Sequence, residues 1–198
     1  NDDISGEEEA RDPPDPVELR RRLRAQRARL RQQKTDEWVE ELAHARAGLR
    51  VVGAIRPVLE QWIGRRHGSL GYRLVQVLTG HGCFGEYLHR IKREESGRCH
   101  HCTSNEDSAR HTLEECPAWA EERRVLREGM GVEVSLPAML EFMLEGEEEW
   151  RSAVSFCEQV MLQKETAERE REEAREAPDI RRRRGGRARR QYDRAALP

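Results

Sequence analysis

Three cysteines and one histidine in the middle of the chain constrain its fold more than any other feature. They form a C-x2-C-x8-H-x4-C array, made of Cys99, Cys102, His111 and Cys116. A Cys-x2-Cys pair places two thiolates on one side of a tight turn, and a later His and Cys can complete a tetrahedral Zn²⁺ shell at about 2.0 to 2.3 Å. Because the protein fills all four positions, none is open to water, and we predict a structural rather than a catalytic zinc site.

The remaining cysteines and the nearby histidines are interpreted as ordinary packing or surface residues. His100 and His101 lie between the first two cysteines and could replace a ligand, but exposed turn positions are the simpler interpretation. Cys83 lies too far upstream to fit the spacing, and Cys157 falls on an apolar helical stripe. Both are therefore predicted to pack against other side chains.

The cysteine count and the start of the chain favour a metal over disulfides. The chain has five cysteines, an odd number, and it opens with no basic-then-apolar signal segment. It also has no run of about 18 apolar residues that could span a bilayer. We therefore expect a reducing, intracellular location, in the nucleus and cytoplasm, and no membrane partner, with disulfides or free thiols as the alternative to zinc.

Charge is segregated along the chain even though the net charge is only -2. Residues 17–34 carry eight basic side chains against Glu18 alone, residues 181–194 carry eight arginines against Asp193 alone, and residues 141–149 are acidic. Nearly all of the basic residues are arginine, which binds phosphate bidentately and stacks on bases. This pattern suits a nucleic-acid partner, although a GC-rich coding sequence or a solvated helix face would produce it too.

The composition predicts one or two small domains with a modest core, since 36% of the 198 residues are hydrophobic and 37% are charged. We expect an all-α fold, a small helical domain organised around a CCHC zinc knuckle, with disordered charged termini. The predicted segments are an acidic disordered tail at 1–16, Arg-rich and apolar helices at 17–95, the zinc unit with its following helix at 96–128, C-terminal helices at 129–176 and a basic disordered tail at 177–198.

Helical patterns account for the first half of the chain. A basic and mostly exposed helix is predicted from Val17 to about Gln33, followed by a new helix that is capped at Thr35 and ends near Gly48. A short helix starting at Pro57 is predicted to stop near Gly64. The next helix runs over Leu70–Leu78 to Gly80, with a strand as the alternative, and another carries Phe84, Tyr87, Leu88 and Ile91 to a stop at Ser96-Gly97.

The array itself lies beside a predicted helix. Asp107-Ser108 can cap a helix that carries His111 and is interrupted at Pro117. His111 and Cys116 are five residues apart, roughly 140° around an α-helix, so an undistorted helix cannot point both at one metal. We therefore expect the helix to end or to tighten before Cys116.

Three further helices are predicted after the array. Trp119, Val125 and Leu126 should cover the zinc unit. A short apolar helix contains Leu136, Met139, Leu140, Phe142 and Met143, and a last helix starts near Glu147 with Trp150, Val154, Cys157 and Met161 on one face. The apolar stripe of this last helix stops at Lys164.

Several segments read together resemble a known family. They are Ile55-Arg56-Pro57, Arg66-His67-Gly68, Leu78-Thr79-Gly80-His81-Gly82-Cys83-Phe84-Gly85-Glu86-Tyr87-Leu88-His89-Arg90, the Cys99-x2-Cys102 pair, and His111-Thr112-Leu113-Glu114-Glu115-Cys116-Pro117-Ala118-Trp119. Their order, from about Trp38 to Lys164, resembles the C-terminal segment, from thumb to CCHC region, of the reverse-transcriptase polyprotein of non-LTR, type-1 retrotransposable elements.

The resemblance implies target-primed reverse transcription, in which a nicked chromosomal end primes copying of element RNA. It also implies that the CCHC ligands are Cys99, Cys102, His111 and Cys116, and that the parent polyprotein is an RNA-directed DNA polymerase with an endonuclease. Catalysis does not carry over, because polymerases need paired metal-binding aspartates and the only Asp pair, Asp2-Asp3, lies in the polar tail. The chain begins with Asn1 rather than Met, and we interpret it as a fragment or a truncated copy of a larger enzyme.

Two hypotheses for function follow. In the first, the chain is a zinc-stabilised module that binds element RNA or target DNA through Arg20, Arg21, Arg22, Arg24, Arg27, Arg29, Arg31, Arg90, Lys92, Arg93, Arg98, Arg181, Arg182, Arg183 and Arg184. In the second, the zinc is a structural clip, and the contacts are to the rest of the polyprotein. Residues 86–116 hold five basic and seven acidic side chains, so the zinc unit itself is not basic. A free-standing enzyme lacks paired catalytic groups.

Overall fold

The computed structural model describes residues 15–174, and the chain divides into two units, residues 1–44 and 45–198. Helix α1 (Pro16–Ala43) is the described part of the first unit. The Asp15 carboxylate caps it by accepting a 3.1 Å hydrogen bond from the backbone N–H of Val17. The predicted tails at 1–16 and 177–198 lie outside the described residues, except for Asp15 and Pro16. Arg181–Arg184 therefore lie outside them too.

Helix α1 is continuous, so the predicted second helix start at Thr35 is wrong. The Thr35 hydroxyl does not cap a helix end but donates to the backbone carbonyl of Arg31, one turn earlier, at 3.0 Å. A Thr that bonds back to the preceding turn can sit inside a helix, which removes the reason for a break. The helix ends at Ala43, before the expected stop near Gly48.

The second unit is built from helices and short helical turns, with no strand among residues 45–174. In chain order they are α2 (Leu49–Ile55), η1 (Arg56–Val58), α3 (Leu59–Gly64), α4 (Tyr72–Thr79), α5 (Gly85–Arg90), η2 (His111–Glu115), η3 (Pro117–Trp119), α6 (Ala120–Met130), α7 (Leu136–Glu145) and α8 (Glu147–Glu173). The all-α prediction is confirmed, and the strand alternative for 70–78 is excluded by α4.

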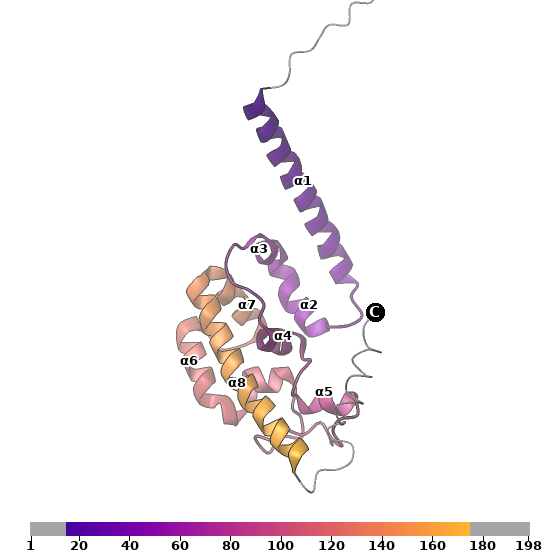
Figure 1. Cartoon of the computed structure of the whole chain (residues 1–198), viewed down its shortest axis with the longest axis vertical. Helices are drawn as coiled ribbons and strands as arrows, with labels where there is room; N and C mark the ends of the chain where they lie inside the picture. Colours follow the sequence, from indigo (N-terminus) through magenta and orange to yellow (C-terminus); the bar gives the residue numbers. More distant parts are fainter. Residues whose placement is uncertain (1–14, 175–198) are drawn as a thin grey trace, which may run out of the picture. The chain divides into compact units, whose positions relative to one another are not determined.

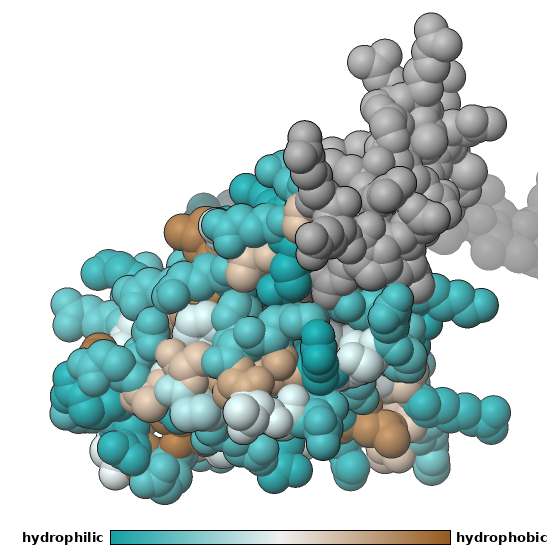
Figure 2. All heavy atoms as spheres, turned by 90° about the horizontal axis from the view of Figure 1, so that it is seen from below, coloured by the Kyte–Doolittle hydropathy of each residue, from teal (hydrophilic) through white to brown (hydrophobic). Residues whose placement is uncertain are grey.

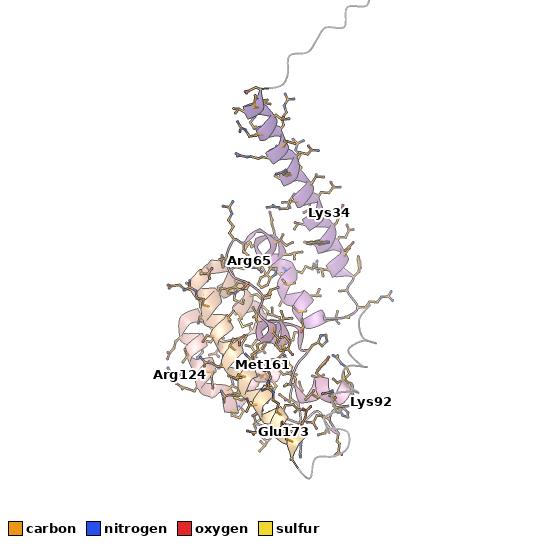
Figure 3. All side chains as sticks on the ribbon, in the orientation of Figure 1. Lys34, Arg65, Lys92, Arg124, Met161 and Glu173 are labelled. Atoms are coloured by element: carbon orange, nitrogen blue, oxygen red, sulfur yellow. The ribbon has the colours of Figure 1, made fainter. Side chains whose placement is uncertain are left out.

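Helix α8 is the centre of the second unit, since α4, α6 and α7 all pack against it (Figure 1). Figure 3 labels Met161 on α8, and this side chain is fully buried in the core. The predicted apolar helix is α7, and the predicted face of α8 is buried as expected except for the partly buried Val154. The core residues contributed by these two helices are Leu136, Met139, Leu140, Phe142, Met143, Trp150, Ala153, Phe156, Cys157, Val160 and Met161.

A second packing centre joins the start of α8 to the segment after α3. The rings of Trp150 and Trp62 lie 5.4 Å apart, and the Arg65 guanidinium lies 4.1 Å from the centre of the Trp62 ring. His67 Nε2 is 2.9 Å from the carbonyl oxygen of Met143. Aromatic burial and a cation over the ring faces therefore hold α3, α7 and α8 together.

Three apolar residues that belong to the predicted helical patterns are exposed. Leu70 is 52% exposed because α4 starts only at Tyr72, and Ile91 is 44% exposed because α5 ends before it. Val125 is 55% exposed because its neighbour Leu126 takes the buried face of α6, about 100° away. A helical pattern of apolar residues does not predict which of two adjacent apolar side chains is buried in the core.

Helix α5 ends earlier than predicted. It stops at Arg90 rather than at Ser96-Gly97, because Lys92 adopts a left-handed conformation with φ of 59°. The backbone N–H of Arg93 then donates to the carbonyl of Leu88 at 2.7 Å, which closes the helix end. Because α5 ends at Arg90, the residues that follow it are free to form the long loop that precedes Cys99.

The face of the molecule shown in Figure 2 carries hydrophilic side chains around smaller hydrophobic areas. None of the helices in residues 15–174 combines the length and apolar character needed to cross a membrane.

A buried ion pair links α8 to the loop between α5 and η2. Lys164 Nζ lies 2.7 Å from Oδ1 and 2.9 Å from Oδ2 of Asp107, and both side chains are almost wholly buried. Asp107 also accepts a 2.9 Å hydrogen bond from the backbone N–H of Gly85 at the start of α5. One carboxylate therefore connects three parts of the fold.

Replacement of Lys164 by Met should lower the free energy of unfolding by about 3 to 5 kcal/mol, because Asp107 would be left as a buried, unpaired charge. Urea denaturation of the metal-loaded chain measures this change. Lys92→Met makes the same substitution at an exposed position and should leave the unfolding free energy unchanged. A Lys164→Met chain as stable as the parent would contradict the role given to the pair.

Candidate metal centre

Cys99 and Cys102 lie on a tight loop between α5 and η2. The backbone N–H of Cys99 donates to the carbonyl of Ser104 at 3.0 Å, which closes the loop. The backbone N–H groups of His101 and Ser104 point at Cys99 Sγ and Cys102 Sγ, each at 3.4 Å. Such N–H donors stabilise negative charge on sulfur, so the loop is shaped to hold two thiolates.

His111 and Cys116 are brought to one side by η2, a single turn of π-helix. The backbone N–H of Cys116 donates to the carbonyl of His111, five residues earlier, at 2.7 Å. Ser108 Oγ accepts from the backbone N–H of His111 at 3.0 Å, so the predicted cap is confirmed. The helix ends before Cys116 as predicted, but its last turn widens instead of tightening, because an i to i+5 bond places residue 116 above residue 111.

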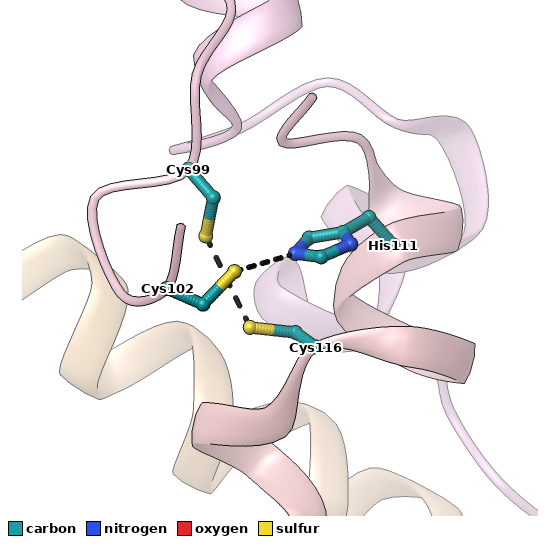
Figure 4. A group of neighbouring side chains, drawn as sticks. All are labelled: Cys99, Cys102, His111 and Cys116. Atoms are coloured by element: carbon teal, nitrogen blue, oxygen red, sulfur yellow. Dashed lines mark hydrogen bonds between the residues drawn. The ribbon is translucent and has the colours of Figure 1, made fainter. Parts of the chain in front are cut away.

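The four side chains converge on one point (Figure 4). Their ligand atoms all lie within 4.8 Å of one another, with Cys99 Sγ 3.9 Å from Cys116 Sγ and Cys102 Sγ 3.2 Å from His111 Nε2. Ligands held about 2.3 Å from a tetrahedral metal are separated by about 3.8 Å. Cys99, His111 and Cys116 are buried and Cys102 is half-buried, so the cluster can hold a metal ion shielded from solvent.

Two charged residues lie next to the ligand segment, and one of them, Arg123, hydrogen-bonds to it. Arg123, on α6, donates to the backbone carbonyls of Cys116 at 3.0 Å and of Leu113 at 3.3 Å, which satisfies carbonyls at the end of η2. A Glu115 carboxylate oxygen lies 3.7 Å from His111 Nδ1, the ring nitrogen that faces away from the sulfurs. At this distance the carboxylate lies beside the imidazole without forming a hydrogen bond to it.

The loop that carries Cys99 and Cys102 packs closely against the start of α5. A Cβ atom at Gly85 would lie 2.5 Å from the carbonyl oxygen of Arg98, so only glycine permits this approach. The backbone N–H of Asp107 donates to the carbonyl of Gly97 at 2.8 Å on the other side of the loop. Asp107, which pairs with Lys164, therefore lies in the same short segment of the chain as the metal ligands, residues 99–116.

The neighbouring histidines point away from the cluster and are half-buried, so their interpretation as exposed turn residues is wrong. His100 Nε2 is 2.9 Å from a Glu94 carboxylate oxygen, and the His101 ring packs on Trp119 with centroids 4.8 Å apart. Burial lowers the pKa of both imidazoles to about 4. Cys83 is half-buried and Cys157 is wholly buried, both packed with the core, in agreement with their interpretation as packing residues.

Burial also acts on the thiols of the cluster. It raises the pKa of Cys116 to about 12 and raises that of Cys99, against the opposing effect of the N–H donors from Ala118 and His101. Thiolates in this environment therefore require a nearby cation.

Among residues 15–174, the basic side chains predicted to contact nucleic acid lie on α1 and in the segment that leads into the cluster. Arg20 to Arg31 lie along α1, where all of them are exposed. Arg90, Lys92, Arg93 and Arg98 are exposed near the loop that leads into the cluster. Arg93 forms a 3.4 Å ion pair with Glu172, and Arg90 lies over the Tyr87 ring.

Sequence reasoning missed the roles of Arg123 and of the Asp107–Lys164 pair. Lys164 follows Cys157 and Met161 on one helical face, so a charged residue continuing an apolar stripe was the available signal. No comparable signal marks Arg123, because its function depends on carbonyl groups exposed by the π-helical turn.

The fold and the cluster define the class: a small all-α domain with a Cys3His centre that can hold a metal ion. No protein-family model matches the chain, and no solved structure matches it. The chain is 34% identical over 98 residues to the retrovirus-related Pol polyprotein from type-1 retrotransposable element R1 of Popillia japonica, a match covering 49% of this chain and 37% of that protein.

A second relative is the Pol polyprotein from type-1 retrotransposable element R1 4 of Nasonia vitripennis, 46% identical over 48 residues, or 24% of this chain. The chain thus spans 37% of the length of the first relative and 12% of the second. The predicted resemblance is confirmed: the chain is similar over part of its length to the Pol polyproteins of type-1 retrotransposable elements.

Purified chain supplied with Zn²⁺ should bind one metal ion, and Cys102→Ser should abolish this stoichiometry and lower the melting temperature, because metal binding supplies folding free energy. Metal analysis together with thermal melting measures both. Cys83→Ser, outside the cluster, is the matched control and should retain the metal. Equal metal content in the two variants would contradict the assignment of ligands.

Metal affinity should rise with pH. Burial raises the pKa of Cys99 and Cys116, so both thiols are protonated near neutral pH in the metal-free chain and must lose protons to bind a metal. Titration calorimetry in buffers of different ionisation enthalpy should detect proton release on binding. The stability of the metal-free chain should depend on pH in the opposite direction. Its free energy of unfolding should fall as pH rises from 9.0 towards about 12, because the thiol of Cys116 holds its proton more tightly in the folded chain than in the unfolded chain. Metal binding without proton release would contradict this assignment.

Proposed function

We propose that this chain is a zinc-binding C-terminal fragment of a non-LTR retrotransposon reverse transcriptase, and that it helps to hold RNA or DNA during target-primed reverse transcription. Polymerase and endonuclease activity are assigned to the parent polyprotein rather than to this fragment, and the proposed location is the nucleus and cytoplasm. The partners would be element RNA, target DNA and the rest of the polyprotein.

Zinc is proposed because three sulfurs and one imidazole nitrogen form a soft donor set of the kind used in tetrahedral structural sites. All four positions would be filled by protein, so the metal would supply folding free energy and fix the loop geometry, leaving no position for a reacting water. Arg123 would hold the end of η2 through its hydrogen bonds to the carbonyls of Leu113 and Cys116.

The observation that carries the nucleic-acid role is the row of exposed arginines on α1. Arg21 and Arg22 form ion pairs with Glu18. The others, Arg20, Arg24, Arg27, Arg29 and Arg31, form no ion pair with any residue in the described range 15–174. Unpaired, exposed guanidinium groups on one long helix are suited to phosphate contacts.

A second candidate function is the structural zinc clip, in which contacts are made mainly to other parts of the polyprotein. It is favoured by the burial of the metal ligands and by the acidic excess in residues 86–116. The two candidates differ in whether the folded, metal-loaded chain binds nucleic acid.

Binding to single-stranded RNA should weaken steeply between about 50 and 200 mM salt, because phosphate contacts release counterions. Replacement of Arg24, Arg27 and Arg31 by Gln should lower affinity at low salt. It should also reduce the slope of log affinity against log salt by about 0.7 for each phosphate that is no longer neutralised. Fluorescence anisotropy with the full chain measures both.

A matched control replaces three arginines that already have carboxylate partners, Arg124, Arg127 and Arg151. This triple variant should keep the parent slope. If the folded, metal-loaded parent fails to bind RNA or DNA at about 50 mM salt, the clip replaces the nucleic-acid role.

A further inference from the structure

Helix α1 is basic over most of its length and acidic near its end. Residues 17–34 carry eight basic side chains against Glu18 alone, whereas residues 36–41 carry four acidic side chains and no basic one. Every residue from 19 to 34 is exposed. Residues 17–34 are therefore the part of α1 that can approach a polyanion, and the acidic side chains after them set the limit of that contact.

Most of the arginines on α1 fall into two rows on opposite sides of the helix. The first row is made of residues three or four positions apart, Arg20, Arg24, Arg27 and Arg31. The second row is made of two residues seven positions apart, Arg22 and Arg29. At 3.6 residues per turn, the centres of the two rows are about 180° apart around the helix axis.

The two faces between these rows differ in the size and polarity of their side chains. One face carries Arg21, Ala25, Ala28 and Gln32, all of them exposed. The two alanines on this face let another molecule approach the backbone of α1 closely. The opposite face carries three exposed leucines, Leu19, Leu23 and Leu30. Only the alanine face combines small side chains with polar ones.

Two rows of cations on opposite sides of one helix match the two phosphate backbones that border a groove of duplex DNA. The major groove of B-DNA is about 12 Å wide and admits an α-helix, whose diameter with side chains is about 10 to 12 Å. The row from Arg20 to Arg31 extends about 16 Å along α1, at about 1.5 Å per residue. This length is about half of the 34 Å turn of DNA, so both rows can follow one groove.

The basic part of α1 lacks the groups that hold a single strand. Proteins bind single-stranded nucleic acid by stacking aromatic side chains on its bases. Residues 16–33 contain no Phe, Tyr or Trp, and the first aromatic residue of α1, Trp38, lies among the acidic side chains. Duplex RNA is also a poor fit, because its major groove is deep and narrow.

The guanidinium groups of both rows are available to phosphates. Arg22 pairs only with Glu18, which also pairs with Arg21, and all three side chains lie at the surface. The other arginines of the rows form no ion pair with any residue between 15 and 174. Exposed ion pairs contribute little free energy, so a phosphate can replace the Glu18 carboxylate.

We propose that α1 binds in the major groove of duplex DNA through residues 20–32. The row from Arg20 to Arg31 contacts the phosphates of one strand, and Arg22 and Arg29 contact those of the other. The alanine face lies against the base edges, and the leucine face points away from the DNA. The proposal rests on the nucleic-acid role proposed above and selects duplex DNA as the ligand of α1.

The test measures fluorescence anisotropy with the full, metal-loaded chain at about 50 mM salt. The probes are a DNA duplex of about 16 base pairs, an RNA duplex of the same sequence, and one strand of each alone. The RNA duplex is the control for charge, because it carries as many phosphates as the DNA duplex. The DNA duplex should bind at least about tenfold more tightly than the other three probes.

A variant with Ala25→Leu and Ala28→Leu enlarges the face that lies against the bases, without a change in charge and with another good helix former. It should reduce the preference for the DNA duplex to below about twofold. A variant with Leu23→Ala and Leu30→Ala makes the reverse exchange on the opposite face and should keep the preference. Circular dichroism checks that α1 stays helical in both variants.

The two rows are tested separately. Arg22→Gln with Arg29→Gln removes two cations from one row, and Arg24→Gln with Arg31→Gln removes two from the other. Each double variant should reduce the slope of log affinity against log salt on the DNA duplex by about 1.8, because each phosphate contact contributes about 0.9. A reduced slope in only one of the two variants would overturn the assignment of one row to each strand.

The outcomes separate this proposal from the proposed function. If a single strand or the RNA duplex binds as tightly as the DNA duplex, α1 does not bind in the major groove and this inference is overturned, although the nucleic-acid role stands. The same holds if the variant with two added leucines keeps the preference. If the folded, metal-loaded chain binds none of the four probes, the nucleic-acid role itself fails and this inference fails with it.

Discussion

The buried pair between Asp107 and Lys164 is the interaction on which the second unit depends. Lys164 comes from α8, the helix that packs against α4, α6 and α7, while Asp107 lies in the loop that leads to the metal ligands. The same carboxylate accepts from Gly85 at the start of α5, and the backbone of Asp107 binds Gly97 and Glu86. Because a buried charge must keep its partner, this pair fixes the loop against the helical core without help from the metal.

The metal cluster completes this connection on the other side of the loop. Cys99 and Cys102 precede Asp107, whereas His111 and Cys116 follow it, so a bound ion would close the chain around the residue that the pair already anchors. The π-helical turn allows this closure, because in a regular α-helix the side chains of His111 and Cys116 would point in different directions. Arg123 then ties the end of that turn to α6. A metal here would contribute stability and loop geometry, and we propose that contacts to nucleic acid are made by exposed side chains elsewhere.

Much of the fold and the ligand set follow from local patterns. The four ligands, the cap at Ser108, the left-handed Gly80 at the end of α4 and the buried face of α7 all depend on neighbours within a few residues. Predictions failed where the same residues allowed two local conformations. Thr35 bonds back to Arg31 instead of starting a helix, Lys92 ends α5 early, and Leu126 rather than Val125 faces the core. The pairing of Asp107 with Lys164 could not be found in advance, because the two residues are 57 positions apart in the chain.

The sequence by itself determined an all-α chain, a Cys3His metal-ligand set and a likeness to type-1 retrotransposon polyproteins, since spacing and motif order are local properties. Tertiary structure alone decided that Lys164 is buried against Asp107 and that a widened helical turn aligns His111 with Cys116. The physical reason is the same in each case. Burial and pairing depend on which distant segments meet, and a charged or polar residue reveals its partner only when the chain has folded around it.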